Sequence, residues 1–411
     1  MPVGQFGQQG GAVGDHRVVE PAVGGMVHRG RGRIQLRQAG RQPDEAAGCG
    51  LQDAGEVLGR GQGFAPADVP VFAEQLLDHI GDVIGGVTYG TGDASKNRVN
   101  AKNLTALGSG AGVYGGQSAY GGKANENIVS LESGQVANIY GGQGSSGASG
   151  NKVSLTNVKV APKNWGLSSI YGGSSTGGSA NSNKLNIQGG SVMGGVYTGR
   201  SSGEASHNEA VVNSTLRGDI YSGYSENDKA DFNTVTFQGG SVGRNVTGGK
   251  GATASSNTVN LNGNTQVAGN VYAAEATSGS DNVVNFRSGS VAGTLYGISS
   301  ANASNSGNSL NILSSNSGNG LNAGNFANFN KLEFNLASLS EIENDVSSNA
   351  KRALSLTGSG NTDLSGTDIF VNSASEFNAL NNASYPDGDN KKYTLAYKSG
   401  GGKFTGYDPR F

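Results

Sequence analysis

The stretch NTVNLNGNTQVAGNVYAAEATSGSDNVVNF, residues 257–286, contains one complete repeat and the beginning of the next. It opens with Asn257-Thr-Val-Asn-Leu, in which an Asn precedes two apolar residues that alternate with polar ones. A further apolar residue and a Tyr follow at Val271-Tyr272, and Asn282 opens the next copy. Alternation over so few residues is typical of short β-strands separated by turns.

The same Asn-x-apolar-x-apolar pattern recurs along most of the chain. Successive copies begin 24 to 32 residues apart, and six of the eight intervals are 24, 25 or 26 residues, which indicates a true repeat. A fixed period of this length is the sequence signature of a solenoid. The clear copies begin at Asn127, Asn151, Asn183, Asn233, Asn257, Asn282 and Asn308, and looser copies begin at Asn97 and Asn208.

The repeat predicts an all-β fold, namely a right-handed parallel β-helix (β-solenoid) of about nine repeats of about 25 residues, from about Gly86 to Leu313. One turn cannot bury enough apolar surface to offset its loss of conformational entropy, so each turn must pair its strands with the turns above and below. We expect the opening Asn to share the inward face and to hydrogen-bond to its equivalent in the next turn. The residues predicted to lie inside are Val129, Leu131, Val153, Leu155, Val259 and Leu261.

A row of tyrosines is the second landmark of the repeat. Each follows an apolar residue, so alternation directs the apolar side chain inward and the Tyr outward. One interpretation is mutual stacking of the rings along the rod. The other is a platform for sugars or another surface. The candidate binding residues in this row are Tyr140, Tyr171, Tyr197, Tyr221 and Tyr272.

The tripeptide Arg217-Gly218-Asp219 is a further candidate binding site. On an exposed turn, Arg-Gly-Asp is an integrin-recognition signal. The competing interpretation is a chance match, because the chain contains 71 glycines.

Catalytic chemistry is not visible in the repeats. Polysaccharide-cleaving enzymes built on β-helices need clustered carboxylates, often with calcium. Only eleven acidic residues lie between residues 86 and 313, and their closest grouping is Glu226, Asp228 and Asp231, which we interpret as a solvated corner. We therefore expect no enzyme activity, no catalytic residues, no metal site and no cofactor.

The charge balance excludes one class of partner. The formal net charge is −2, and no basic patch of the kind that binds nucleic acid is visible. There is also no run of 18 or more apolar residues, so we expect no membrane-spanning helix.

Composition changes abruptly near residue 86. Residues 1–85 contain no Ser, Thr, Asn, Tyr or Lys, but they hold seven of the arginines, five of the eight prolines and the single cysteine, Cys49. We interpret this low-complexity segment as disordered and of separate coding origin. The predicted organisation is residues 1–85 as this segment, residues 86–313 as the solenoid, and residues 314–411 as a β-rich closing region.

The array N-x-V-x-L…G-x-V…V-Y-G-G resembles the Gly/Asn-rich passenger regions of bacterial autotransporters, the type V secreted surface proteins. Phe329–Leu336, Asp363–Val371 and Lys392–Ala396 resemble the closing part of such passengers. The resemblance implies a β-helix displayed outside a Gram-negative cell, commonly serving adhesion, aggregation or biofilm formation. Two departures are the absence of an export signal at the start and of barrel strands at the end, so we expect a fragment whose membrane contact depends on a barrel elsewhere.

Three functions follow as hypotheses. The first is a non-enzymatic, adhesin-like surface passenger, located at the cell surface or outside it, whose partner is a host or bacterial surface receptor, a glycan, or another copy. The second is a polysaccharide-processing β-helix enzyme, which a surface groove of carboxylates would favour. The third is a structural spacer, which the absence of any exposed Tyr or apolar stripe would favour.

Overall fold

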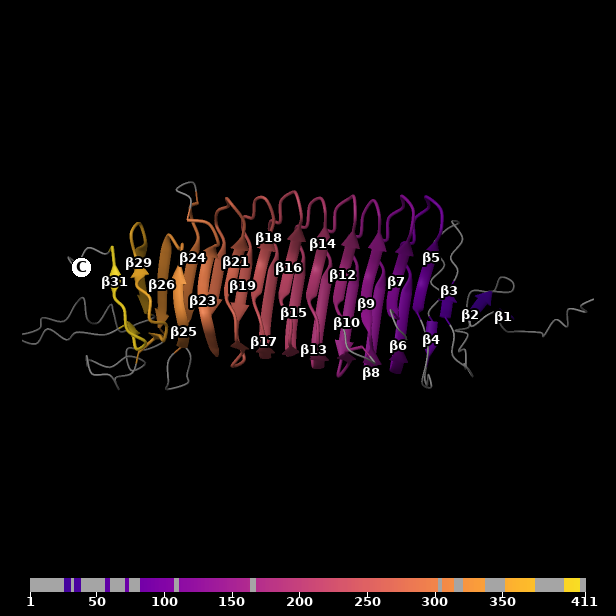
Figure 1. Ribbon diagram of the computed structural model, residues 1–411, viewed down its shortest axis with the longest axis horizontal. Coiled ribbons are helices and arrows are strands. Elements are labelled where there is room, and N and C mark those ends of the chain that lie inside the picture. The colour runs from indigo at the N-terminus through magenta and orange to yellow at the C-terminus, as the bar shows by residue number, and fades with distance from the viewer. Residues whose placement is uncertain are drawn as a thin grey trace, which may run out of the picture.

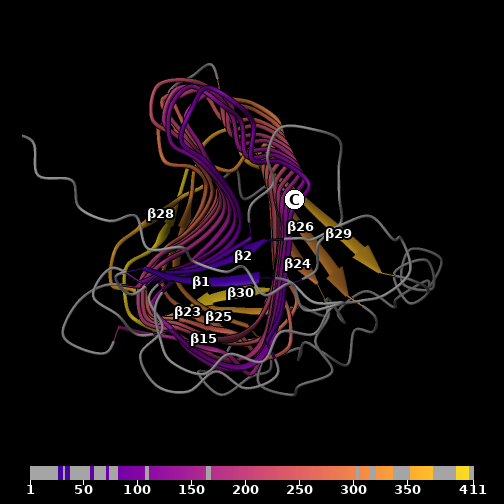
Figure 2. The same ribbon diagram turned by 90° about the vertical axis from the view of Figure 1, so that its right-hand side faces the viewer.

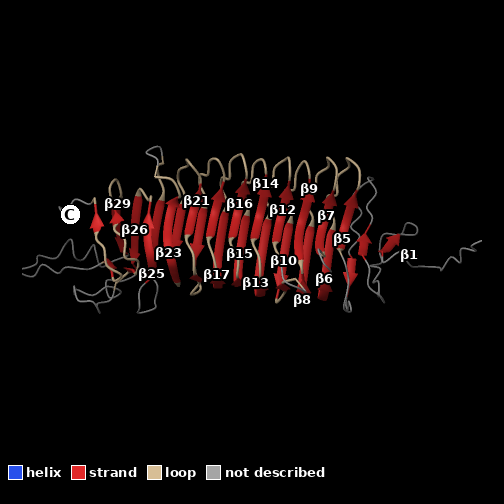
Figure 3. Ribbon diagram, viewed as in Figure 1, coloured by secondary structure: helices blue, strands red, loops and turns tan. Residues whose placement is uncertain are grey.

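The computed structural model describes residues 26–30, 33–37, 56–59, 71–73, 82–106, 111–162, 168–301, 305–313, 321–336, 352–373 and 395–406. These residues form a rod of stacked turns. The strands lie across the long axis of the rod and are stacked side by side along it (Figure 1). All described secondary structure is β-strand, as Figure 3 shows. Within the described ranges, no helix has the length and apolar character needed to cross a bilayer.

Each turn contributes strands to three parallel ladders, which surround the interior of the rod in the end view (Figure 2). Ladder A holds the Asn-x-apolar-x-apolar strands, and its neighbours pair in register, as in Val153 with Val129. Its members are β6 (Arg98–Ala106), β8 (Ile128–Val136), β10 (Lys152–Thr156), β13 (Lys184–Val192), β15 (Glu209–Leu216), β17 (Thr234–Val242), β19 (Thr258–Leu261), β22 (Val283–Phe286), β24 (Ser309–Leu313), β26 (Lys331–Leu336) and β29 (Asp368–Ser373).

Ladder B is formed by the Gly-x-Val segments, several of which are the second halves of long ladder A strands. Its separate members are β11 (Lys159–Val160), β20 (Gln266–Val267), β27 (Leu354–Leu356) and β30 (Ala396–Lys398), together with the first halves of β23 (Ser290–Ile298) and β25 (Leu321–Ala327).

Ladder C carries the tyrosines. It contains β5 (Val83–Thr88), β7 (Gly112–Ser118), β9 (Asn138–Gly144), β12 (Ile170–Ser175), β14 (Val196–Ser201), β16 (Ile220–Ser225), β18 (Val246–Lys250), β21 (Val271–Glu275) and the second halves of β23 and β25. A separate parallel pair joins β28 (Thr362–Asp363) to β31 (Phe404–Thr405).

The predicted register of the core is confirmed. Val129, Leu131, Val153, Leu155, Val259 and Leu261 are each at most 2% exposed. The large core side chains of the later turns are Phe237, Phe286 and Phe334, which are in register with Val212, Leu261 and Ile312 of the preceding turns. The alternation read from the sequence therefore sets which side of each strand faces inward.

The buried Asn ladder is also confirmed. Asn233 is fully buried, and its Oδ1 accepts hydrogen bonds from the backbone N–H and the Nδ2 of Asn208, each at 3.0 Å. Asn233 in turn donates to Asn257 Oδ1 through the same two groups, at 2.9 and 3.0 Å. The same pair of contacts joins consecutive members from Asn97 to Asn308.

The Gly of each Gly-x-Val segment is required by geometry. Gly134, Gly190, Gly240 and Gly289 all have positive φ, between 70° and 103°. A Cβ on Gly240 would lie 2.0 Å from the carbonyl oxygen of Ser214 in the preceding turn. Only glycine combines that backbone conformation with so close an approach of two turns.

The parallel pairing extends past both expected ends of the array. Before residue 86, Val83 and Ile84 already pair in register with Val113 and Tyr114. Short strands nearer the N-terminus also pair in parallel: β3 (Glu56–Gly59) with β5, β4 (Val71–Ala73) with β6, and β2 (Arg33–Arg37) with β3. The pair formed by β2 and β1 (Met26–Gly30) is antiparallel. Beyond Leu313, β24, β26 and β29 continue ladder A, so the β-rich closing region adds rungs to the same rod.

Candidate functional site

The outward face of ladder C carries a continuous stack of five tyrosines. Adjacent rings are nearly parallel, with interplanar angles of 2° to 10° and centroids 4.7 to 5.2 Å apart. All five are partly exposed, while the apolar residue before each of them is fully buried. We call Tyr114, Tyr140, Tyr171, Tyr197 and Tyr221 the tyrosine stack.

The stacking changes what this row can offer to a partner. The rings stack on one another, as the first interpretation of this row predicts, so the faces inside the stack are covered by the neighbouring rings. The rings also lean back over the residue two places earlier, because a Cβ on Gly195 would lie 2.9 Å from the ring of Tyr197. What the stack presents is therefore ring edges and phenol groups.

The stack is interrupted after Tyr221. Thr247 pairs in register with Tyr221 on one side and Tyr272 on the other, so it occupies the tyrosine position of its turn. Its side chain is fully buried, and among the described residues its hydroxyl has no hydrogen-bond partner. The row resumes with Tyr272 and Tyr296, whose rings stack at 4.8 Å.

A second row lies three residues after the tyrosines on the same face. Near the N-terminal end it is an amide row, in which Gln117 Nε2 donates to Gln143 Oε1 at 2.9 Å. Further along, Arg200, Tyr224, Lys250 and Glu275 occupy consecutive rungs in register. Sequence reasoning did not single out these residues; the signal was their constant spacing of three residues after the tyrosine position.

Tyr224 and its neighbours form a compact aromatic and ionic group, which we call the Tyr224 cluster: Tyr224, Arg200, Lys250, Glu226 and Glu275. The Tyr224 ring is nearly perpendicular to Tyr197 and Tyr221, at 84° and 87°. The Arg200 guanidinium and the Lys250 ammonium each lie 5.6 Å from the centroid of Tyr224. Arg200 pairs with Glu226 at 3.2 Å, and Lys250 pairs with Glu275.

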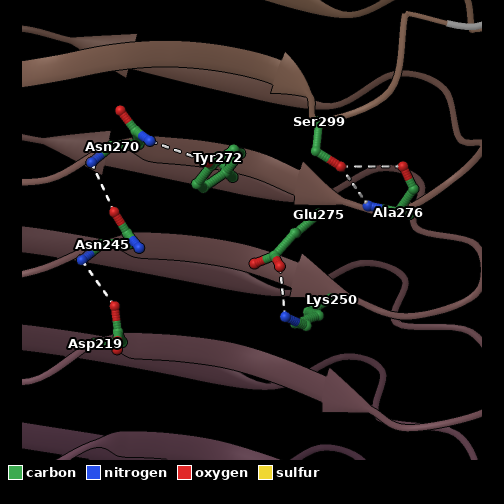
Figure 4. A network of polar contacts seen from close by, with 8 residues as sticks. All are labelled: Asp219, Asn245, Lys250, Asn270, Tyr272, Glu275, Ala276 and Ser299. Atoms are coloured by element: carbon green, nitrogen blue, oxygen red, sulfur yellow. Dashed lines mark hydrogen bonds and ion pairs between the residues drawn. The ribbon is translucent and has the colours of Figure 1, made fainter.

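A polar row flanks the tyrosines at the start of the ladder C strands. Asp219 Oδ1 accepts from the backbone N–H of Asn245 at 3.0 Å, and Asn245 Oδ1 accepts from that of Asn270 at 2.8 Å. Asn270 Nδ2 then donates to the Tyr272 hydroxyl at 2.9 Å. Figure 4 shows this row beside the pair formed by Lys250 and Glu275.

The Arg-Gly-Asp tripeptide lies at this corner, and its Asp belongs to the polar row. Besides its bond from Asn245, the Asp219 carboxylate lies 4.0 Å from Arg244 Nη1, and the side chain is 23% exposed. Arg217 is exposed, and a Cβ on Gly218 would lie 2.3 Å from the Gly194 carbonyl oxygen. Asp219 and Gly218 therefore take part in the packing between neighbouring turns. Integrin recognition stays a prediction.

Burial raises the pKa of the Tyr114, Tyr140, Tyr197 and Tyr221 phenols. The pKa of Tyr140 rises to about 12, chiefly through burial and then through the neighbouring Tyr171. The pKa values of Tyr114 and Tyr221 also rise, because of burial and then because of Asp82 and Asp219 respectively. These four phenols are therefore neutral at physiological pH.

The acidic residues predicted to form a solvated corner are engaged separately. Glu226 pairs with Arg200, Asp228 Oδ1 accepts from the Lys229 backbone N–H, and Asp231 Oδ1 accepts from that of Ser255. Within the part of the chain that the structure describes, no group of three His, Cys, Asp or Glu residues could hold a metal ion.

The fold and the repeated contacts define a parallel β-solenoid. No protein-family model, curated protein or solved structure matches this chain.

Proposed function

We propose that this chain is a non-enzymatic passenger displayed on the outside of a Gram-negative cell, where it acts as a rigid rod that mediates adhesion or aggregation. The fold supports a rod, and the Gly/Asn-rich repeats resemble autotransporter passengers. The observation that carries the adhesive part is the row of five partly exposed tyrosines on one face. Many weak contacts along such a face add through multivalency.

The stacked geometry decides which groups would make the adhesive contact. Because the ring faces cover one another, the phenol hydroxyls and ring edges are what a partner surface meets. Tyr is well suited to this role, since a ring held by its neighbours loses little further conformational entropy on binding. The partner would be a surface receptor, a glycan or a second copy on a neighbouring cell.

Two triple variants test the proposal on bacteria that display the rod. Replacing Tyr140, Tyr171 and Tyr197 by Phe keeps every ring and removes three hydroxyls, so we expect an unchanged melting temperature and reduced cell–cell aggregation. Replacing the same three by Ser removes all four ring contacts of the stack, which we expect to cost roughly 2–6 kcal/mol at about 0.5–1.5 kcal/mol per pair.

The comparison separates an adhesive role from a purely structural one. Surface display must be equal, as measured with an antibody to a terminal tag. If the Phe variant aggregates normally, and the Ser variant also does so while folded, the tyrosine face is not adhesive and the spacer hypothesis takes its place.

A further inference from the structure

The Tyr224 cluster differs from the rest of the face in the direction of its aromatic ring. The tyrosine stack runs along the rod, so its ring planes lie across the axis. Tyr224 is perpendicular to Tyr197 and Tyr221, so its ring faces point away from the stacking direction. Among the described residues no ring is stacked parallel to Tyr224; its neighbours are the edge contacts with Tyr197 and Tyr221 and the cations of Arg200 and Lys250, and the side chain is partly exposed.

The charges around this ring are balanced. Arg200 and Lys250 lie on the rungs before and after Tyr224, and each is paired with a carboxylate of a neighbouring rung, Glu226 or Glu275. All four charged side chains are 30% to 45% exposed, so they are accessible without unfolding. Two cations and two carboxylates give no net charge, which fits a neutral ligand better than an anionic one.

The cluster also coincides with the break in the tyrosine row. Thr247 lies on the same strand as Lys250, and its buried hydroxyl has no hydrogen-bond partner within the described residues. Such groups are normally satisfied in proteins.

We propose that the Tyr224 cluster is a binding subsite for an extended neutral polysaccharide that lies along the rod. The apolar face of a sugar ring packs on Tyr224, and the sugar hydroxyls hydrogen-bond to the Arg200–Glu226 and Lys250–Glu275 pairs. These side chains recur once per rung, about 4.8 Å apart, so consecutive sugars of an extended chain meet them in order. The proposal rests on the adhesive function and names its ligand class.

Direct binding to the purified full chain tests this inference. The probes are immobilised hexasaccharides of β-1,4-linked glucose and of β-1,4-linked N-acetylglucosamine, with a galacturonic acid hexasaccharide as the anionic comparison. We expect binding to at least one neutral probe and weaker binding to the anionic one. Tyr224→Ala should weaken neutral binding about tenfold, and Tyr224→Phe should retain it, because the ring makes the contact.

Two controls make the outcome decisive. Tyr120→Ala removes a tyrosine that is 67% exposed and lies outside the cluster, so it should bind as the parent does. If Tyr224→Ala is misfolded by its melting curve, Glu226→Gln serves instead. That side chain is 45% exposed, and we expect weaker binding because an amide is a poorer acceptor than a carboxylate.

The inference is overturned if the parent binds neither neutral probe, binds only the anionic one, or binds equally well after Tyr224→Ala in a folded protein. Loss of aggregation in the Tyr140, Tyr171 and Tyr197 variants without any sugar binding would leave the adhesive function standing and remove this ligand class. Sugar binding together with normal aggregation in those variants would support this ligand class and remove the adhesive function of the tyrosine stack.

Discussion

At the scale of the residue, the buried Asn is the main joint between turns. From Asn127 to Asn282, the side-chain oxygen of each Asn accepts two hydrogen bonds from the preceding turn, while the backbone N–H and Nδ2 of the same residue donate to the Asn of the following turn. The Asn amide combines an NH₂ donor group with a carbonyl acceptor and carries no charge, so it can be buried in a continuous row. Ionised Asp has no side-chain donor, and Leu has neither a donor nor an acceptor, so neither could make the hydrogen bonds to both the preceding and the following turn.

Asn233→Ala should therefore destabilise the rod strongly. It would leave the backbone N–H and Nδ2 of Asn208 buried without an acceptor, and each unsatisfied group costs about 1–3 kcal/mol. We expect a loss of roughly 2–5 kcal/mol, measured by urea unfolding. Asn260→Ala is the matched control, because Asn260 lies on the outer side of its strand and is only partly buried. Equal effects of the two changes would contradict a joint made by the buried row.

At the scale of the element, ladder C shows what the repeat pattern can and cannot predict. The identity of the tyrosines and their side of the strand follow from alternation, because Val or Ile precedes each one. The orientation of the rings does not follow from alternation, because it depends on the side-chain torsion angles. Gly112 and Gly195 are the local sequence features that relate to ring orientation, because each lies under the tyrosine ring two residues further on.

The Tyr224 cluster was missed for a related physical reason. The position three residues after the tyrosine does not keep one residue type: it is Gln143, Arg200, Tyr224 or Lys250 in different turns. No sequence repeat marks it, and its contacts arise only when the turns are in register. The core and the Asn ladder were predictable because the same residue type returns at the same position.

The tyrosine stack should also make the rod less stable at strongly alkaline pH. The pKa of Tyr140 is about 12 in the folded protein, above the ordinary value of about 10. Between these values the unfolded chain has released a proton that the folded one retains, so stability falls as pH rises. The contribution of Tyr140 to stability is complete below about pH 10 and is lost as pH rises through about 12.

Urea unfolding between neutral and strongly alkaline pH checks this dependence. The parent should lose stability steadily over the alkaline part of the range, alongside the rise in phenolate absorbance. Tyr140→Phe keeps the ring but cannot ionise, so this variant should lose less stability than the parent as the pH rises. An identical alkaline slope in the two proteins would show that Tyr140 is not responsible.

At the scale of the whole molecule, stability is distributed along the rod. The strands of each turn pair with those of the turns before and after it, so stability is approximately a sum of turn terms and interface terms. The core is one continuous column of apolar side chains rather than a central cluster. Damage to one turn should spread first to its neighbours.

Val259→Asp tests this behaviour near the middle of the described rod. Val259 is fully buried between Val235 and Val284, so a carboxylate there has no partner. We expect a loss of more than about 3 kcal/mol. Hydrogen exchange should accelerate most in β17, β19 and β22, and less toward the ends of the rod.

Gln266→Asp is the control for introducing the same charge at an exposed position of that turn. It should leave melting and exchange close to those of the parent. Uniform acceleration along the whole rod after Val259→Asp would instead indicate a single cooperative unit.

The uniformity of the Asn joint has a consequence for inheritance. Because each turn meets the next through the same amide contact, an extra turn needs no new interface at either side. A gene segment coding for one whole repeat can be duplicated or lost by recombination between neighbouring copies, and the product remains a continuous rod. Each such event changes the reach of the rod by about 4.8 Å. Its length is therefore a trait that can vary between lineages while every local contact is preserved.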